Sequence, residues 1–152
     1  MVVDTAIYTI HTGFSALWAG SVLFVAAAVL PLAMDGDLSP DAFGSVVSTL
    51  RWITRISAVL LFVTGGYLAG TLYTADTLTG TPSGYLVVVM LALWFGLAAL
   101  VEVGSGKASR GVENDKIREP ARKARPFYLL AAGFAVGLLV VSGLLGTPVP
   151  VF

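Results

Sequence analysis

The chain has 152 residues, of which 57% are hydrophobic and only 12% are charged, and its mean hydropathy is +0.88. Soluble globular domains are about half apolar and about a quarter charged, so this chain has too few charges to cover a soluble surface. The composition excludes a disordered chain, a nucleic-acid-binding domain and an ordinary cytosolic enzyme. The sequence contains no cysteine, which excludes disulfides, thiolate chemistry and iron–sulfur clusters.

Four long apolar stretches predict the architecture. They cover about residues 6–33, 46–73, 85–103 and 127–146. Each reaches the roughly 20 residues that a helix needs to cross about 30 Å of hydrocarbon. If these four helices were buried in a soluble protein, too few residues would remain in this short chain to shield them from water. We therefore predict an all-α protein, a polytopic membrane four-helix bundle that forms a single transmembrane domain over residues 1–152.

The positions of the basic residues predict the orientation in the membrane. The nine Lys and Arg residues fall into two groups. Arg51 and Arg55 form the first group, and the other seven lie from Lys107 to Arg125. Both groups flank connections on the same side of a four-span protein. The positive-inside rule places such connections in the cytoplasm. We therefore predict a multi-pass protein of the cell membrane, with connections 34–45 and 104–126 in the cytoplasm and both termini outside.

The first and third stretches share a short sequence. Ala-Leu-Trp-Ala-Gly covers residues 16–20, and Ala-Leu-Trp-Phe-Gly covers residues 92–96. The two stretches run in the same direction across the membrane, as do the second and fourth. The match indicates either a duplicated helix pair, forming a parallel repeat, or coincidence among residues that are common in membrane helices. The position that corresponds to His11 is Val87.

Small residues at four-residue spacing are candidates for helix packing. Gly66 and Gly70 lie in the second stretch, and Gly133 and Gly137 lie in the fourth. Because lipid provides no hydrophobic driving force between helices, close approach at such residues stabilises their association. The pattern fits packing within the bundle, a homodimer, or contact with a larger membrane complex.

Arg55 and Glu102 are predicted to form a structural ion pair. Arg55 lies about 27 Å down the second helix from Tyr73, and Glu102 lies at about the same depth in the third helix from Tyr85. An unpaired charge at that depth is costly. We therefore expect the two side chains to meet near the cytoplasmic boundary.

His11 is the one histidine and lies early in the first stretch. At helical spacing it shares a face with Ser15, Trp18 and Val22. An ionisable residue inside a membrane is a candidate functional residue, and a neutral imidazole can bind haem iron or a metal ion or relay protons. The alternative is a structural histidine that is hydrogen-bonded near the membrane surface.

Haem b is a better match to this sequence than copper. Haem needs one strong axial ligand and an apolar slot lined by aromatic side chains. His11 is then the candidate ligand, and Trp18 is a candidate cofactor-binding residue. Cu(I) prefers thiolates, thioethers or several imidazoles, but the chain has three methionines and no cysteine. The sequence contains no phosphate-binding loop, Ser–His–acid set or paired membrane carboxylates, so it indicates no catalytic residue.

The first stretch also resembles a known family. It carries Thr-Ile-His ending at His11, Trp-Ala-Gly beginning at Trp18, and Leu-Pro ending at Pro31. These motifs resemble the first helix of the CopD-like copper-resistance membrane domain, and they are similar to those of the related HemJ-type protoporphyrinogen oxidases. The resemblance implies a four-helix membrane protein that is transport-related or binds haem or metal through His11. A non-catalytic accessory or assembly subunit of a larger membrane complex is the alternative.

Overall fold

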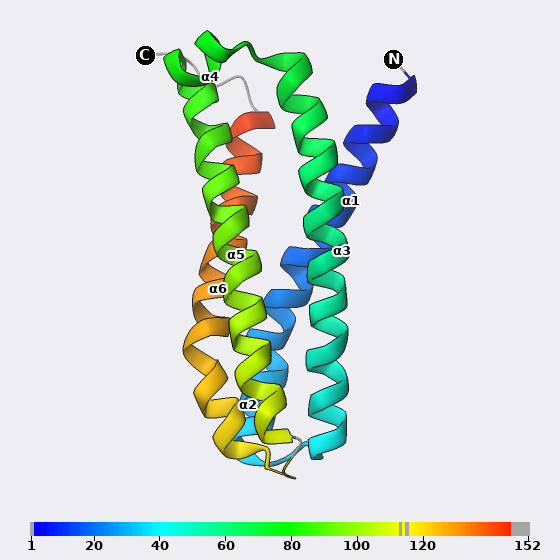
Figure 1. The fold of residues 1–152 in the computed structure, drawn as a ribbon, viewed down its shortest axis with the longest axis vertical. Coiled ribbons are helices and arrows are strands. Elements are labelled where there is room, and N and C mark those ends of the chain that lie inside the picture. Colours follow the sequence, from blue (N-terminus) through cyan, green and yellow to red (C-terminus); the bar gives the residue numbers. More distant parts are fainter. Residues whose placement is uncertain (1, 113, 115, 147–152) are drawn as a thin grey trace.

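The computed structural model describes residues 2–112, 114 and 116–146, and these residues form an all-α bundle of four long helical segments (Figure 1). Glu113, Asp115 and residues 147–152, which belong to the predicted third connection and the C-terminal end, lie outside the described residues. Each helical segment is long and apolar enough to cross a membrane. The predicted fold class is therefore confirmed, and the outward-facing apolar side chains support a multi-pass membrane protein.

The first helical segment changes its winding near its end. Helix α1 covers Val2–Phe24, a π-helical turn (η1) covers Val25–Val29, and helix α2 covers Leu30–Asp35. Pro31 is the second residue of α2. Because proline has no N–H and its ring clashes with the carbonyl four residues earlier, the backbone widens before it. Gly36 ends the segment with a φ of 84°, a conformation that glycine adopts at little cost.

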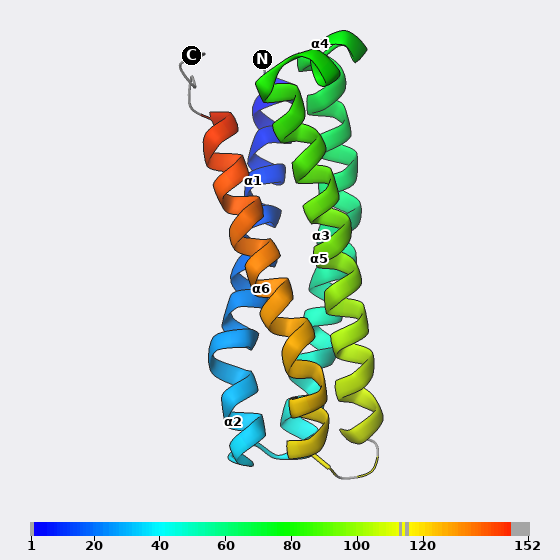
Figure 2. The same ribbon diagram turned by 90° about the vertical axis from the view of Figure 1, so that its left-hand side faces the viewer.

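The remaining helices complete an up-and-down arrangement. Helix α3 covers Pro40–Leu72, the short α4 covers Ala75–Gly80, α5 covers Pro82–Val112 and α6 covers Arg118–Gly146. The Ser39 side chain caps α3 by accepting a hydrogen bond from the amide of Ala42. Figures 1 and 2 place the Val2 end of α1, α4 and the Gly146 end of α6 at one end of the bundle.

The helices extend beyond the predicted apolar stretches at the opposite end. The expected connection 104–126 is largely helical, because α5 continues to Val112 and α6 begins at Arg118. Helix α6 runs through Pro126, which sequence analysis placed before the fourth span. Helix α3 has 33 residues and is about 50 Å long, which exceeds the roughly 30 Å hydrocarbon thickness. The bundle therefore reaches beyond the hydrocarbon region.

The buried core lies towards this basic end. In α1, the first buried residue is Trp18, and Figure 1 shows α1 diverging from α5 and α6 towards its Val2 end. In α6, most of the buried residues lie between Pro120 and Ala135. One half of the bundle is thus closely packed, whereas the other half is more open.

Close packing between α5 and α6 depends on small residues. A side-chain carbon added at Gly104 would lie 3.2 Å from Cβ of Phe127, and one added at Gly96 would overlap the Phe134 ring. The hydroxyl groups of Ser105 and Tyr128 are hydrogen-bonded at 3.0 Å, and both residues are fully buried. This helix pair therefore packs closely where both helices present small side chains.

Three of the four glycines that are candidates for helix packing make no close contact inside this chain. A side-chain carbon at Gly66, Gly70 or Gly133 would meet no atom within 4 Å, so of the three alternatives, packing within the bundle, a homodimer or a larger complex, the first does not involve these positions. Gly137 does approach a neighbour, because its added carbon would lie 3.3 Å from Leu93. The three open glycines lie on exposed parts of α3 and α6, because the helices are rotated to bury other faces.

Replacing Gly104 tests the close contact between α5 and α6. We expect Gly104→Leu to lower the free energy of unfolding in detergent by about 1–3 kcal/mol, because the side chain would overpack a filled interface. Gly133→Leu is the matched control on an open face and should change it by less than about 0.5 kcal/mol. Thermal melting followed by circular dichroism measures both, and equal losses would contradict this assignment of the packed face.

Candidate ligand-binding site

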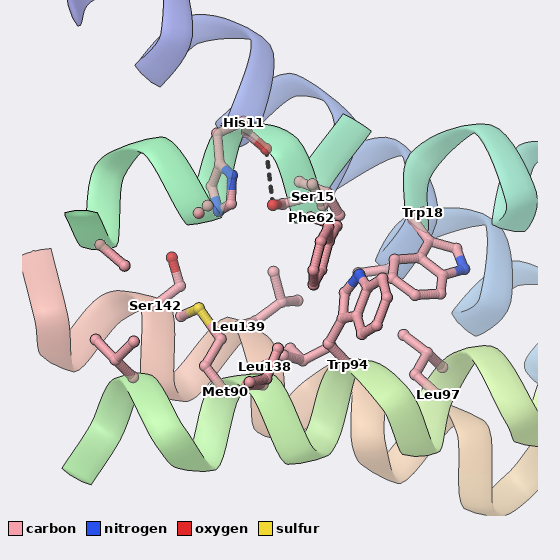
Figure 3. Close-up of a pocket in the computed structure, with 17 residues that line it drawn as sticks. His11, Ser15, Trp18, Phe62, Met90, Trp94, Leu97, Leu138, Leu139 and Ser142 are labelled. Carbon is pink, nitrogen blue, oxygen red and sulfur yellow. Dashed lines mark hydrogen bonds between the residues drawn. The ribbon is translucent and has the colours of Figure 1, made fainter. Parts of the chain in front are cut away.

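A cavity of about 250 Å³ lies between α1, α3, α5 and α6 in the open half of the bundle. His11 lies on its α1 side and Met90 on its α5 side, as Figure 3 shows. Its walls are mostly apolar and aromatic, and the lining residues include Trp18, Phe62 and Trp94. Such a cavity, with few polar groups in an apolar wall, is typical of a small-molecule site.

A hydrogen bond to Thr64 of α3 holds the His11 ring. The distance between His11 Nδ1 and Thr64 Oγ1 is 2.8 Å. The Thr64 hydroxyl has one proton, and the carbonyl oxygen of Leu60 is an acceptor for it at 2.7 Å. When that proton points to Leu60, Thr64 accepts from an Nδ1–H group of His11, and Nε2 keeps a free lone pair for a ligand. When it points to His11 Nδ1 instead, Nε2 carries the ring proton.

The α3 helix also approaches the imidazole very closely. A side-chain carbon added at Gly65 would lie 3.2 Å from Cε1 of His11. A larger residue at position 65 would therefore push against the ring. Ser15, one turn after His11, donates to the His11 carbonyl oxygen at 2.7 Å (Figure 3). The proton of the Ser15 hydroxyl is therefore bonded to the backbone of its own helix.

Aromatic residues form the end of the cavity nearest the core. Trp18 is 1% exposed, and its indole N–H donates to Thr54 of α3 at 3.0 Å. The Trp94 indole lies beside Trp18 in Figure 3, and its ring centroid is 5.5 Å from that of Phe62. These rings give a rigid, largely aromatic floor, to which Leu97 also contributes.

Two buried polar atoms near the core have no hydrogen-bond partner among the described residues. They are the indole nitrogen of Trp94 and the hydroxyl oxygen of Ser57. Buried polar groups are rarely left unpaired. Trp94 belongs to the cavity wall, so its N–H group is a donor that the protein itself does not satisfy.

The side chains that line the cavity suit a metal complex that carries its own ligands, such as haem, better than a bare metal ion. Within the described part of the chain, there is no group of three or more His, Cys, Asp or Glu residues that could hold a metal ion. A copper or zinc ion bound by protein alone takes three or four such ligands. Haem supplies four nitrogen ligands itself and needs only one or two from the protein.

Arg55 and Glu102 come together at the other end of the bundle, and Arg51 joins them. Arg55 Nε lies 2.7 Å from Glu102 Oε1, and Arg51 Nη2 lies 3.1 Å from Glu102 Oε2. The sequence predicted only the pair of Arg55 and Glu102. The helical spacing of residues 51 and 55 was the signal for the second arginine, because residues four apart lie on one helix face.

No family model, curated protein or solved structure matches this chain.

Replacing Thr54 tests whether it holds Trp18 in place. We expect Thr54→Val to lower the free energy of unfolding by about 1–3 kcal/mol, because it leaves a buried indole N–H unpaired. The loss should largely disappear in a Trp18→Phe background, which lacks the donor. Thr49→Val, on an exposed part of α3, is the control. An equal loss in both backgrounds would show that the hydrogen bond is unimportant.

Proposed function

We propose that this multi-pass membrane protein binds haem b in the cavity between its helices, with His11 as the axial ligand through Nε2. The observation that carries the proposal is the hydrogen bond between His11 Nδ1 and Thr64 Oγ1. Ligating histidines typically donate their other ring N–H to a fixed acceptor, which sets the tautomer and the ring orientation. Thr64 would be that acceptor when His11 binds iron through Nε2.

The walls of the cavity support a flat, apolar ligand. Trp18, Phe62 and Trp94 provide aromatic faces, and the rim includes the exposed residues Gly66 and Leu139. A ring system larger than the cavity volume can therefore extend past the rim towards the surrounding lipid. Met90 on the α5 wall would offer a thioether as a further ligand for the iron. Haem would add redox chemistry when bound, and the chain would supply binding, orientation and exclusion of water.

The visible spectrum of the purified protein tests this proposal. We expect a Soret band after expression with haem supply, and we expect His11→Ala to abolish it because the axial ligand is lost. Ser142→Ala is a control in the same cavity wall and should keep the band. A band of unchanged intensity and position in His11→Ala, or a wild-type protein that stays colourless on haem titration, would contradict the proposal.

The Thr64 contact gives a second, quantitative test. We expect Thr64→Val to weaken haem binding by about 10- to 100-fold, because the ring loses the acceptor that fixes its tautomer. Haem titration followed at the Soret band measures this change. Thr71→Val, on the exposed end of α3, is the control and should not alter the titration. Equal affinities for wild type and Thr64→Val would show that the tautomer is not important for binding.

A second candidate function is that of a non-catalytic accessory subunit. Gly66, Gly70 and Gly133 leave flat, open surfaces on α3 and α6, which favours contact with another membrane helix or with a second copy of the chain. A colourless protein that co-purifies with a larger complex would support this function. Transport of copper or another small solute has less support, because the cavity walls are mainly apolar.

We also propose that the basic end of the bundle faces the cytoplasm of the cell and that both termini face outward. The chain has no cysteine, so single-cysteine variants report topology without background labelling. We expect Thr79→Cys to react with a membrane-impermeant maleimide in intact cells, and Arg122→Cys to react only after permeabilisation. The reverse pattern would overturn this orientation. Both positions are exposed.

A further inference from the structure

The ionic cluster at the basic end of the bundle contains more positive than negative charge. Glu102 of α5 is bonded by Arg51 and Arg55, which lie one helical turn apart on α3. One carboxylate therefore faces two guanidinium groups, and the cluster has a net charge of +1. A structural ion pair needs only one cation for each anion, so the cluster has one cation more than the pairing of Glu102 requires.

The hydrogen bonds show the same excess. Arg51 donates to Glu102 from Nε at 3.2 Å and from Nη2 at 3.1 Å, and Arg55 donates from Nε at 2.7 Å and from Nη2 at 3.2 Å. A carboxylate has about four acceptor positions, whereas each guanidinium has five N–H donors. Glu102 accepts three of these bonds at Oε2 and one at Oε1, while most of the N–H donors of the two guanidinium groups are not bonded to it.

Both arginine side chains are partly exposed. The side chains are 32% exposed for Arg51 and 54% exposed for Arg55. Arg55 lies 17 residues before the end of α3 at Leu72, which is about 26 Å along the helix and therefore close to one hydrocarbon thickness. This depth corresponds to the headgroup layer at the basic end, if the Leu72 end lies at the opposite boundary.

We propose that Arg51 and Arg55 bind the phosphodiester headgroup of an anionic phospholipid in the leaflet at the basic end of the bundle. A single phosphodiester, with one negative charge, neutralises the excess positive charge of the cluster. The planar guanidinium fork suits bidentate contact with phosphate oxygens. Anionic lipids are attracted to basic sites at membrane-spanning helices.

The residues around the cluster favour a lipid over free phosphate. Trp52, next to Arg51, is 62% exposed, and Val59, one turn beyond Arg55, is 64% exposed. On α5, Val103 is 45% exposed beside Glu102. Tryptophan is enriched at the membrane interface, and the apolar side chains offer contact to acyl chains. The ligand class indicated is therefore an anion that carries apolar chains.

Lipid retention measured by native mass spectrometry tests the proposal. The purified protein is equilibrated in detergent with equal amounts of phosphatidylglycerol and phosphatidylcholine of the same acyl composition. We expect wild type to retain phosphatidylglycerol preferentially, and we expect Arg51→Gln/Arg55→Gln to lower the ratio of the two lipids by roughly 10- to 30-fold. Arg122→Gln/Arg125→Gln removes the same charge from exposed positions on α6 and should lower the ratio by less than about threefold.

Two further variants keep the test valid if the double glutamine variant folds poorly. Arg51→Lys/Arg55→Lys preserves the charge and a partner for Glu102, but it loses the fork, so we expect a partial loss of preference. Glu102→Gln removes the competing carboxylate and frees both guanidinium groups, so we expect a higher ratio of phosphatidylglycerol to phosphatidylcholine than in wild type. A purely structural cluster would instead lose stability in Glu102→Gln, with no change in the lipid ratio.

Three results would overturn the proposal. The first is a wild-type protein that shows no preference for phosphatidylglycerol. The second is an equal loss of preference in the Arg122→Gln/Arg125→Gln control, which would indicate a general surface attraction. The third is complete displacement of phosphatidylglycerol by excess inorganic phosphate, which would assign the site to a free anion.

Discussion

Hydrogen bonds between α1 and α3 determine where the candidate ligand-binding residues lie. Trp18 bonds to Thr54, and His11 bonds to Thr64, so two polar contacts connect the same pair of antiparallel helices. In an apolar environment the helices gain little from hydrophobic contact, and a sliding helix would leave buried polar groups unpaired. The two contacts therefore fix the register of α1 against α3. With that register, His11 reaches the cavity from one wall.

The two ends of the bundle meet different requirements. At the basic end, fully buried side chains and the Ser105–Tyr128 hydrogen bond hold α5 and α6 tightly together. At the other end, α1 diverges and leaves the cavity beside His11. A site that must admit a ligand needs room and access, and neighbouring rigid elements must keep its geometry. The closely packed half supplies that rigidity, because the same helices continue into the open half.

Sequence analysis could predict the features that depend on composition and period. The four apolar stretches indicated the four-helix bundle, and the depths of Arg55 and Glu102 along their helices indicated that these residues would meet. The spacing of the glycines could not show which face each helix buries. Gly70 and Gly133 have small neighbours four residues away, yet they lie on exposed parts of their helices. Helix rotation results from the sum of all contacts, which a local motif does not contain.

The position of Thr64 was likewise beyond the sequence. Threonine is common in helices that cross membranes, and nothing in its neighbours distinguishes Thr64 from Thr71. Only the antiparallel register of α1 and α3 brings Thr64 to His11. The helix ends differ from those that the sequence predicts, because the charges of 104–126 indicate a connection between two apolar stretches. Lys, Arg and Glu are good helix formers, and α5 and α6 extend well into this region.

The lining of the cavity bears on the two explanations of the shared sequence, a duplicated helix pair or coincidence. Ten of its lining residues form five pairs whose members are 76 residues apart, the same spacing that separates the two Ala-Leu-Trp sequences. The pairs are His11 and Val87, Ser15 and Leu91, Trp18 and Trp94, Phe62 and Leu138, and Gly66 and Ser142. In a ring of four helices, a two-fold axis along the bundle relates the first helix to the third and the second to the fourth. Corresponding residues then face the same central space. A duplication would thus have produced a symmetric cavity, in which a histidine on one side alone makes the two walls chemically different.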